Sequence, residues 1–167
     1  MILFVADAFV NQYQGGAELT TEAIIDTSLF PVNKVLSQQL SLELMEKYQN
    51  AVWIFGNFSA VKAECLLYAA QNLHYYVIEY DYKYCKYRSV KKHERFESRC
   101  DCATASNGKL VAAFLAKAQN IFWMSEGQKQ DQSSVFPFLN KGTILSSVFS
   151  RDTLALLKSL DITSKNN

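Results

Sequence analysis

Short apolar segments of strand length alternate along the chain with segments of helical period, and this alternation limits the possible folds more than any other feature. The strand candidates are residues 2–6, 34–36, 51–55, 75–79, 121–124 and 143–146. Several are apolar at successive positions, which is typical of strands buried on both faces of a sheet. The pattern therefore predicts a parallel sheet.

Apolar residues that recur every three or four positions predict helices in the intervals between these strands. A last helix is expected after Ser150, where leucines follow at helical spacing. The predicted N-terminal caps are Ser59 for a helix over residues 60–72, Asn107 for one over 108–118, and Ser125, whose capping-box partner is Gln128.

The length of 167 residues suits one domain, and 49% hydrophobic against 20% charged residues excludes a disordered chain. We expect a Rossmann-like α/β domain over residues 1–150, an open parallel sheet of about six strands with helices on both faces. Residues 151–167 are expected to form a terminal helix and tail. In such folds, ligands bind at the carboxyl ends of the strands.

The overall charge and the apolar segments set limits on partners. Seventeen basic and sixteen acidic residues leave a net charge of +1, so no global field attracts nucleic acid. The longest apolar stretches, 1–6 and 110–116, are far shorter than the roughly 18–20 residues that span a bilayer. No basic segment precedes the first stretch, as a signal peptide would require. With four cysteines expected to be reduced thiols, the sequence predicts a cytoplasmic protein.

A loop from Asp7 to Gln14 follows the first predicted strand, and Gly15 and Gly16 then open a helix. Adjacent glycines allow positive φ angles and close approach of a ligand, and the amides at a helix N-terminus bind anions. The turn therefore suits a phosphate-bearing ligand. Alternatively the glycines only form the turn, with Glu18 favourably placed in the first helical turn. Neither the dinucleotide fingerprint nor the P-loop motif occurs.

Three strand-to-helix junctions carry distinctive residues in order along the chain. They are Ile2-Leu3-Phe4-Val5 with Gly15-Gly16-Ala17-Glu18, then Ile78-Glu79-Tyr80-Asp81-Tyr82 with Cys85, then Ile121-Phe122-Trp123-Met124-Ser125-Glu126. Together they resemble the N-terminal domain of a GT-B glycosyltransferase of the family 4 type, from residue 1 to about 150. The resemblance implies transfer of a sugar from a nucleotide-sugar donor to a sugar or glycan acceptor, with no other cofactor.

The resemblance also implies roles for individual residues. Asp81 and Tyr80 would be catalytic, although the family commonly has His at the position of Tyr80. Asp7 and Asp81 follow the first and fourth strands, so both could face one crevice and orient a sugar hydroxyl, or could instead cap loop amides. The residues expected to bind substrate or the donor phosphate are Gly15, Gly16, Glu18 and Asp7.

The donor-binding Glu-x7-Glu pair of the family belongs to its second domain, and no two glutamates here are eight positions apart. The chain is therefore expected to supply the acceptor-binding half of a hexosyltransferase. Residues 151–167 would begin the link to a donor-binding domain that this chain lacks. Such a half is expected to be inactive alone.

Residues 83–99 hold seven of the 17 basic residues, and six of the nine tyrosines lie in or just before this segment. The position of this segment after the fourth strand favours acceptor binding. Alternatively, the segment is a solvated loop without a ligand, or it binds an anionic membrane surface or single-stranded nucleic acid. The net charge near zero disfavours specific nucleic-acid binding. The competing function is a nonenzymatic Rossmann-like binding module that uses this basic, tyrosine-rich segment. The predicted acceptor-binding residues are Tyr82, Lys83, Arg88, Lys91 and Lys92.

Cys85, His93, Cys100 and Cys102 are residue types that bind zinc. Their spacing argues against a zinc site, because structural sites usually use paired C-x2–4-C motifs and only Cys100 and Cys102 are close in sequence. The sequence therefore predicts no metal. Cys65, on the apolar face of a helix, is expected in the core.

Overall fold

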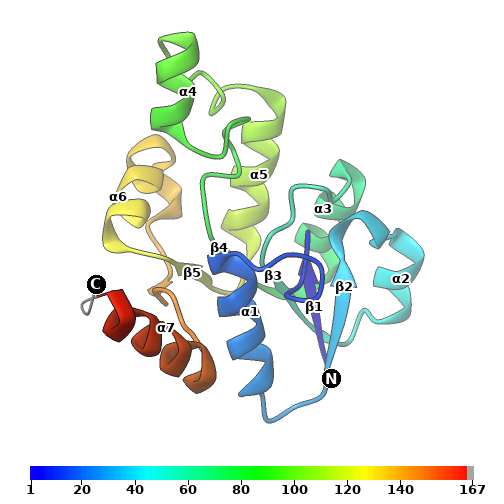
Figure 1. The fold of residues 1–167 in the computed structure, drawn as a ribbon. Coiled ribbons are helices and arrows are strands. Elements are labelled where there is room, and N and C mark those ends of the chain that lie inside the picture. Colours follow the sequence, from blue (N-terminus) through cyan, green and yellow to red (C-terminus); the bar gives the residue numbers. More distant parts are fainter. Residues whose placement is uncertain (165–167) are drawn as a thin grey trace.

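The computed structural model describes residues 1–164, and these form a six-stranded sheet in which every pair of neighbouring strands is parallel (Figure 1). The strand order is β2-β1-β3-β4-β5-β6. This arrangement confirms the predicted open α/β fold. The strands are β1 (Ile2–Ala6), β2 (Val32–Leu36), β3 (Val52–Phe55), β4 (His74–Glu79), β5 (Ile121–Trp123) and β6 (Thr143–Ile144).

Helices connect the strands and cover both faces of the sheet (Figure 1). Two 3-10 turns, Ser37–Gln39 and Pro137–Leu139, complete the connections. The helices are α1 (Gly16–Asp26), α2 (Leu42–Lys47), α3 (Ala63–Asn72), α4 (Val90–Glu97), α5 (Ser106–Lys117), α6 (Glu126–Val135) and α7 (Arg151–Ser164).

The larger core lies between the sheet and helices α2, α3 and α5. Aromatic rings fill its centre: Tyr75 of β4 stacks on Phe114 of α5 at a centroid distance of 4.7 Å, and Phe55 of β3 meets both rings edge-on. The buried Tyr75 hydroxyl donates a hydrogen bond of 2.6 Å to the Phe114 carbonyl oxygen. A polar group buried in this way needs such a partner. The core thus fixes β3 and β4 against α5.

The opposite face of the sheet carries a smaller core. Phe4 and Ala6 of β1 and Ile78 of β4 pack there with Ile24 of α1. Helix α7 lies beside α1, as Figure 1 shows, with Leu156 next to the α1 residues in a shared groove. Its start at Arg151 confirms the helix predicted after Ser150.

The helix caps agree with the sequence at one of three predicted positions. The Ser125 hydroxyl accepts a hydrogen bond from the Gln128 amide at the start of α6, as predicted. Helix α3 instead begins after Lys62, and α5 after Ala105. Ser59 and Asn107 are therefore not N-caps. Ser59 is bonded to the loop after β1, and this long-range contact replaces the local cap.

Strand order places a topological switch point between β1 and β3. The chain leaves β1 for β2 on one side of the sheet, whereas β3 follows on the other. Two crossovers that diverge from neighbouring parallel strands leave a crevice at the carboxyl ends of those strands, where ligands of such folds bind. The loops after β1 and β3 therefore border the candidate ligand site of this fold. No helix within residues 1–164 combines the length and apolar character needed to cross a bilayer.

Gly108, in the first turn of α5, touches the backbone of the turn that holds Cys102. A Cβ at this position would overlap the Cys102 carbonyl oxygen and lie 2.9 Å from its carbonyl carbon. Because backbone atoms cannot rotate away, we expect Gly108→Ala to lower the free energy of unfolding by about 1–3 kcal/mol, measured by urea denaturation. Gly127→Ala in α6 is the matched control, since its nearest neighbour would be 3.9 Å away. Equal stability of the two variants would contradict this packing.

Candidate functional site

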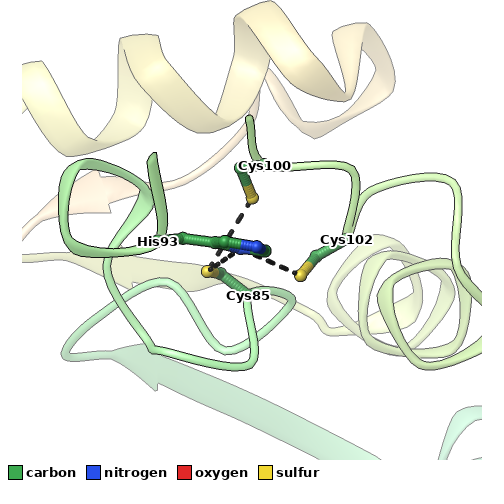
Figure 2. A group of neighbouring side chains, drawn as sticks. All are labelled: Cys85, His93, Cys100 and Cys102. Carbon is green, nitrogen blue, oxygen red and sulfur yellow. Dashed lines mark hydrogen bonds between the residues drawn. The ribbon is translucent and has the colours of Figure 1, made fainter. Parts of the chain in front are cut away.

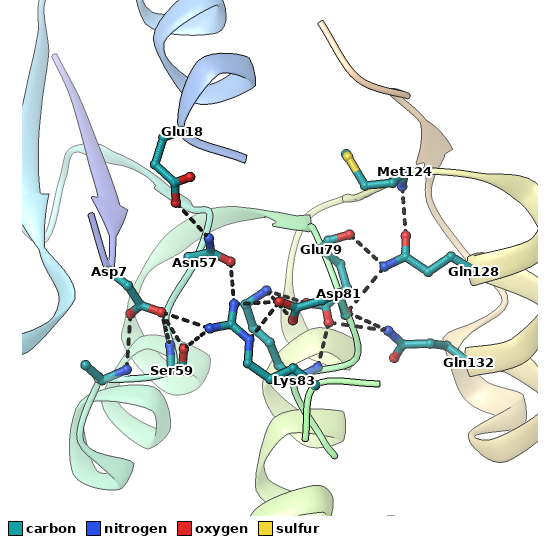
Figure 3. A network of polar contacts seen from close by, with 12 residues as sticks. Asp7, Glu18, Asn57, Ser59, Glu79, Asp81, Lys83, Met124, Gln128 and Gln132 are labelled. Carbon is teal, nitrogen blue, oxygen red and sulfur yellow. Dashed lines mark hydrogen bonds and ion pairs between the residues drawn. The ribbon is translucent and has the colours of Figure 1, made fainter. Parts of the chain in front are cut away.

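The loops after β1, β3 and β4 meet at the carboxyl edge of the sheet in one polar network (Figure 3). Each loop contributes residues directly after its strand: Asp7 after β1, Asn57 and Ser59 after β3, and Asp81 after β4. The network therefore occupies the switch point of the sheet. Asp7 and Asp81 both contact Arg88, so the structure brings them together at one edge of the sheet, as their positions in the sequence predicted.

Arg88 joins the three loops. Its Nη2 atom lies 2.6 Å from the Asp81 carboxylate and donates to Asn57 Oδ1 at 2.7 Å. Its Nη1 atom donates to Ser59 Oγ at 2.7 Å and lies 3.5 Å from the Asp7 carboxylate. A planar guanidinium suits this task because it presents several donors in a fixed plane. Arg88 has a positive φ of 55°, a conformation that its surroundings must hold.

Asp7 accepts hydrogen bonds from two loops. The amides of Ser59 and Ala60 donate at 3.2 and 3.1 Å, and the Ser37 and Ser59 hydroxyls donate as well. Burial raises the pKa of this carboxyl, but the hydrogen bonds outweigh burial and hold the pKa below its usual value of 3.8. Of the two roles considered for Asp7, capping of loop amides is therefore present in the structure.

A buried ionic group lies directly beneath this network. Glu79, the last residue of β4, is fully buried, and its carboxylate is 3.6 Å from the Lys83 ammonium. Burial raises the pKa of Glu79, and the Lys83 charge opposes the rise. Lys83 also lies 3.2 Å from Asp81, while Gln128 donates to the Glu79 carbonyl oxygen at 2.9 Å. These contacts fasten the start of the loop after β4 to α6.

The start of α1 is joined to the same network. Asn57 donates to the Glu18 carboxylate at 3.5 Å while its carbonyl oxygen accepts from Arg88. Gly15 is the N-cap, and no side chain of the described residues caps this helix. A Cβ on Gly16 would have no neighbour within 4 Å, so the backbone there is open to approach. The turn does not use the positive φ angles that glycine allows: Gly15 has φ −104°, and only Gly142 among the six glycines has a positive φ.

The Tyr80 side chain is bonded to α1. Its hydroxyl lies 2.8 Å from Thr21 Oγ1 on α1, and burial raises the pKa of Tyr80 to about 12. The hydroxyl therefore stays protonated at neutral pH. This placement supports a role in positioning α1, and contact with a reacting group remains a prediction.

The predicted acceptor-binding residues occupy three different environments. Lys83 is buried and Arg88 is committed to the network, so neither belongs to a free basic patch. Lys92 is exposed on α4. Tyr82 and Lys91 line a groove of about 380 Å³ between α4 and α6. Its polar wall includes Asp131, which accepts from the Tyr82 hydroxyl at 2.7 Å.

Several network residues were not predicted from the sequence. Asn57 and Ser59 follow β3 at the switch point, and this position was the signal that could have identified them. Ser37 and Gln132 reach the network only through tertiary contacts, and no local pattern marks them.

The structure brings together the four residues whose spacing argued against a metal site. Cys85, His93, Cys100 and Cys102 offer one ligand atom each, and these atoms lie within 4.8 Å of one another (Figure 2). Burial raises the pKa of the Cys100 thiol to about 12. Three thiols and an imidazole are the donors that could hold a metal ion in this fold.

Comparisons with known proteins add no further assignment. The chain matches no protein-family model, no curated protein and no solved structure. The fold and the two side-chain clusters are therefore the basis for the functional proposals.

We expect Asp7→Asn to destabilise the protein by about 1–3 kcal/mol near neutral pH, because an amide NH2 would face N–H and O–H donors. The folded-state pKa of Asp7 is lowered, so its stabilising contribution is full above pH 3.8 and is lost as the pH falls through that lowered value. Urea denaturation across this range should show the difference from wild type shrinking below pH 3.8.

Asp26→Asn is the matched control, since Asp26 is exposed at the end of α1. It should change stability by less than about 0.5 kcal/mol. A constant difference between wild type and Asp7→Asn at every pH would show that the charge of Asp7 does not matter.

Proposed function

We propose that this chain is the acceptor-binding, N-terminal half of a cytoplasmic GT-B glycosyltransferase, which transfers a sugar from a nucleotide-sugar donor once a donor-binding domain completes the cleft. The observation that carries the proposal is the convergence at the switch point. There the open start of α1, the Asn57 loop and the Asp81 loop are bonded to one another. A two-domain enzyme needs such a surface as one wall of its cleft.

The start of α1 is the part of this wall best suited to phosphate. Its first amides have no side-chain cap within the described structure, and Gly16 leaves space for close approach. The positive end of the helix dipole and unpaired N–H groups together bind anions. Arg88, joined to α1 through Asn57, offsets part of the negative charge of Asp7 and Asp81 at the same edge of the sheet.

Carboxylates at this edge suit the hydroxyl groups of a sugar. Asp81 has a partly exposed side chain, at 26%, and accepts from Arg88, which fixes the position of its carboxylate. A positioned carboxylate can accept a hydrogen bond or a proton from a hydroxyl. The α4–α6 groove would take a further part of the acceptor, since its volume falls within the range of about 300–1,000 Å³ that is typical of small-molecule sites.

A binding module is the second candidate. The observation that favours it is the exposure of Lys91 and Lys92, adjacent residues on a helix with few buried side chains. Exposed lysines of this kind attract anionic surfaces. On this reading the edge network would be structural, and the lysines would bind the partner.

The two proposals predict different effects of replacing Gly16. We expect inorganic pyrophosphate and UDP-glucose to shift the amide resonances of residues 16–18 in ¹H–¹⁵N NMR spectra, and Gly16→Val to abolish these shifts by covering the amides. Gly127→Val is the matched control, because Gly127 also lies in the first turn of a helix with room for a side chain. Absence of shifts at residues 16–18 in the wild type, or their persistence in Gly16→Val, would overturn the glycosyltransferase proposal.

The lysines test the alternative. If the chain is a binding module, it should sediment with vesicles that contain phosphatidylserine, and Lys91→Ala with Lys92→Ala should reduce that binding severalfold. Salt should have the same effect, because exposed charges are screened over about 8–10 Å. In the enzyme the double variant should mainly raise the acceptor KM. Vesicle binding that survives both salt and the double variant would contradict the module.

A further inference from the structure

Helix α4 lacks the apolar stripe that normally holds a short helix on a protein. Its only buried residue is His93, and Phe96 is 65% exposed. Helices of this length are unstable alone and depend on packing of an apolar face. The one side chain that α4 buries is an imidazole, and that imidazole faces three thiols (Figure 2).

The spacing of these ligand atoms agrees with a tetrahedral zinc site. Zinc bonds of about 2.3 Å to sulfur and about 2.0–2.1 Å to nitrogen place ligand atoms about 3.8 Å (S to S) and about 3.5 Å (S to N) apart. His93 Nδ1 lies 3.4 Å from both Cys85 Sγ and Cys102 Sγ. Cys85 Sγ and Cys100 Sγ are 3.8 Å apart. Only small adjustments would be needed to admit the ion.

The second nitrogen of the imidazole is held as it is in zinc proteins. His93 Nε2 lies 3.2 Å from the Glu97 carboxylate, which also accepts from Lys86 Nζ at 2.6 Å and from the Tyr87 hydroxyl at 2.8 Å. A carboxylate that accepts from one imidazole N–H leaves the other nitrogen free to bind a metal and fixes the orientation of the ring. Glu97 therefore selects Nδ1 as the ligand atom.

A backbone amide supports one of the ligand sulfurs. The Lys86 amide donates a hydrogen bond to Cys102 Sγ, with an N to S distance of 3.5 Å. When zinc binds, three S–H bonds are replaced by three S–Zn bonds and the protons pass to solvent, which leaves a net charge of −1 on the site. No oxidant or reductant is needed.

We propose that Cys85, His93, Cys100 and Cys102 form a closed structural zinc site, and that this zinc holds α4 and the loop after β4 on the domain. Four protein ligands leave no open position for a substrate, so the ion acts on structure and not as a catalyst. Three thiolates with one imidazole favour zinc over magnesium, calcium or manganese. The inference is independent of the glycosyltransferase proposal.

Metal analysis of the full chain, purified without a metal-affinity step, tests the site. We expect about one zinc per chain in the wild type and at least a tenfold lower content in Cys102→Ser after dialysis against a weak chelator. Cys65→Ser is the matched control, a buried cysteine outside the cluster, and should retain its zinc. Loss of zinc from both variants, or a wild-type chain that takes up no zinc after reconstitution, would overturn the proposal.

A second variant keeps all four metal-binding side chains and so tests the site even if Cys102→Ser fails to fold. We expect Glu97→Gln to weaken zinc binding about 10–100-fold through the imidazole, whereas Glu94→Gln, exposed on the same helix, should leave it unchanged. Cobalt in the wild-type site should give the visible absorption of tetrahedral thiolate ligation and be displaced by zinc. An octahedral cobalt spectrum, or a native mass two hydrogens short because Cys85 and Cys100 form a disulfide, would contradict the site.

Discussion

The contact of the Arg88 guanidinium with Asp7 and Asp81 is the interaction on which the arrangement of loops at the carboxyl edge of the sheet depends. The two carboxylates follow β1 and β4, which lie on either side of β3, and without a cation between them they would repel one another across the switch point. Arg88 also bonds to Asn57 and Ser59, so a single side chain sets the spacing of three crossover loops. The neighbouring start of α1 is then held through Asn57 and Glu18.

The sheet could be predicted from the sequence because parallel strands that are buried on both faces are apolar at successive positions, and this pattern is visible within each strand. Runs such as Ile2–Ala6 and Val52–Phe55 are apolar without alternation, and a helix separates each of them from the next strand. The register and order of the strands depend on which crossovers pack, and this information is not local. The helix caps show the same limit. The Ser125 cap was predicted correctly because its hydrogen bond lies within its own turn. The Ser59 cap was predicted wrongly because Ser59 bonds to Asp7, 52 residues away.

The Cys/His cluster shows why sequence spacing did not predict that these four side chains would lie together. In a paired C-x2–4-C motif, one tight turn presents two ligands. Here helix α4 brings together residues that are distant in sequence. Cys85 precedes the helix, His93 is its buried residue, and Cys100 and Cys102 follow it. The useful signal in the sequence was the helix itself, since α4 is rich in Lys, Arg and Glu and has almost no apolar residues with which to pack.

The two clusters are joined through the backbone. Arg88 lies in the sequence between Cys85 and His93 of the proposed zinc site. Its amide donates to the Cys85 carbonyl oxygen at 2.8 Å, and its carbonyl oxygen accepts from the Tyr82 amide at 3.3 Å. A residue with positive φ persists only where its surroundings determine its conformation. A zinc ion that closes the loop on both sides of Arg88 would supply that constraint. If the loop opened, the guanidinium would leave Asp7 and Asp81, and two carboxylates without a counter-charge would lie near the start of α1, where we propose that phosphate binds. A zinc ion that keeps the loop closed would therefore favour an anionic ligand at this edge of the sheet.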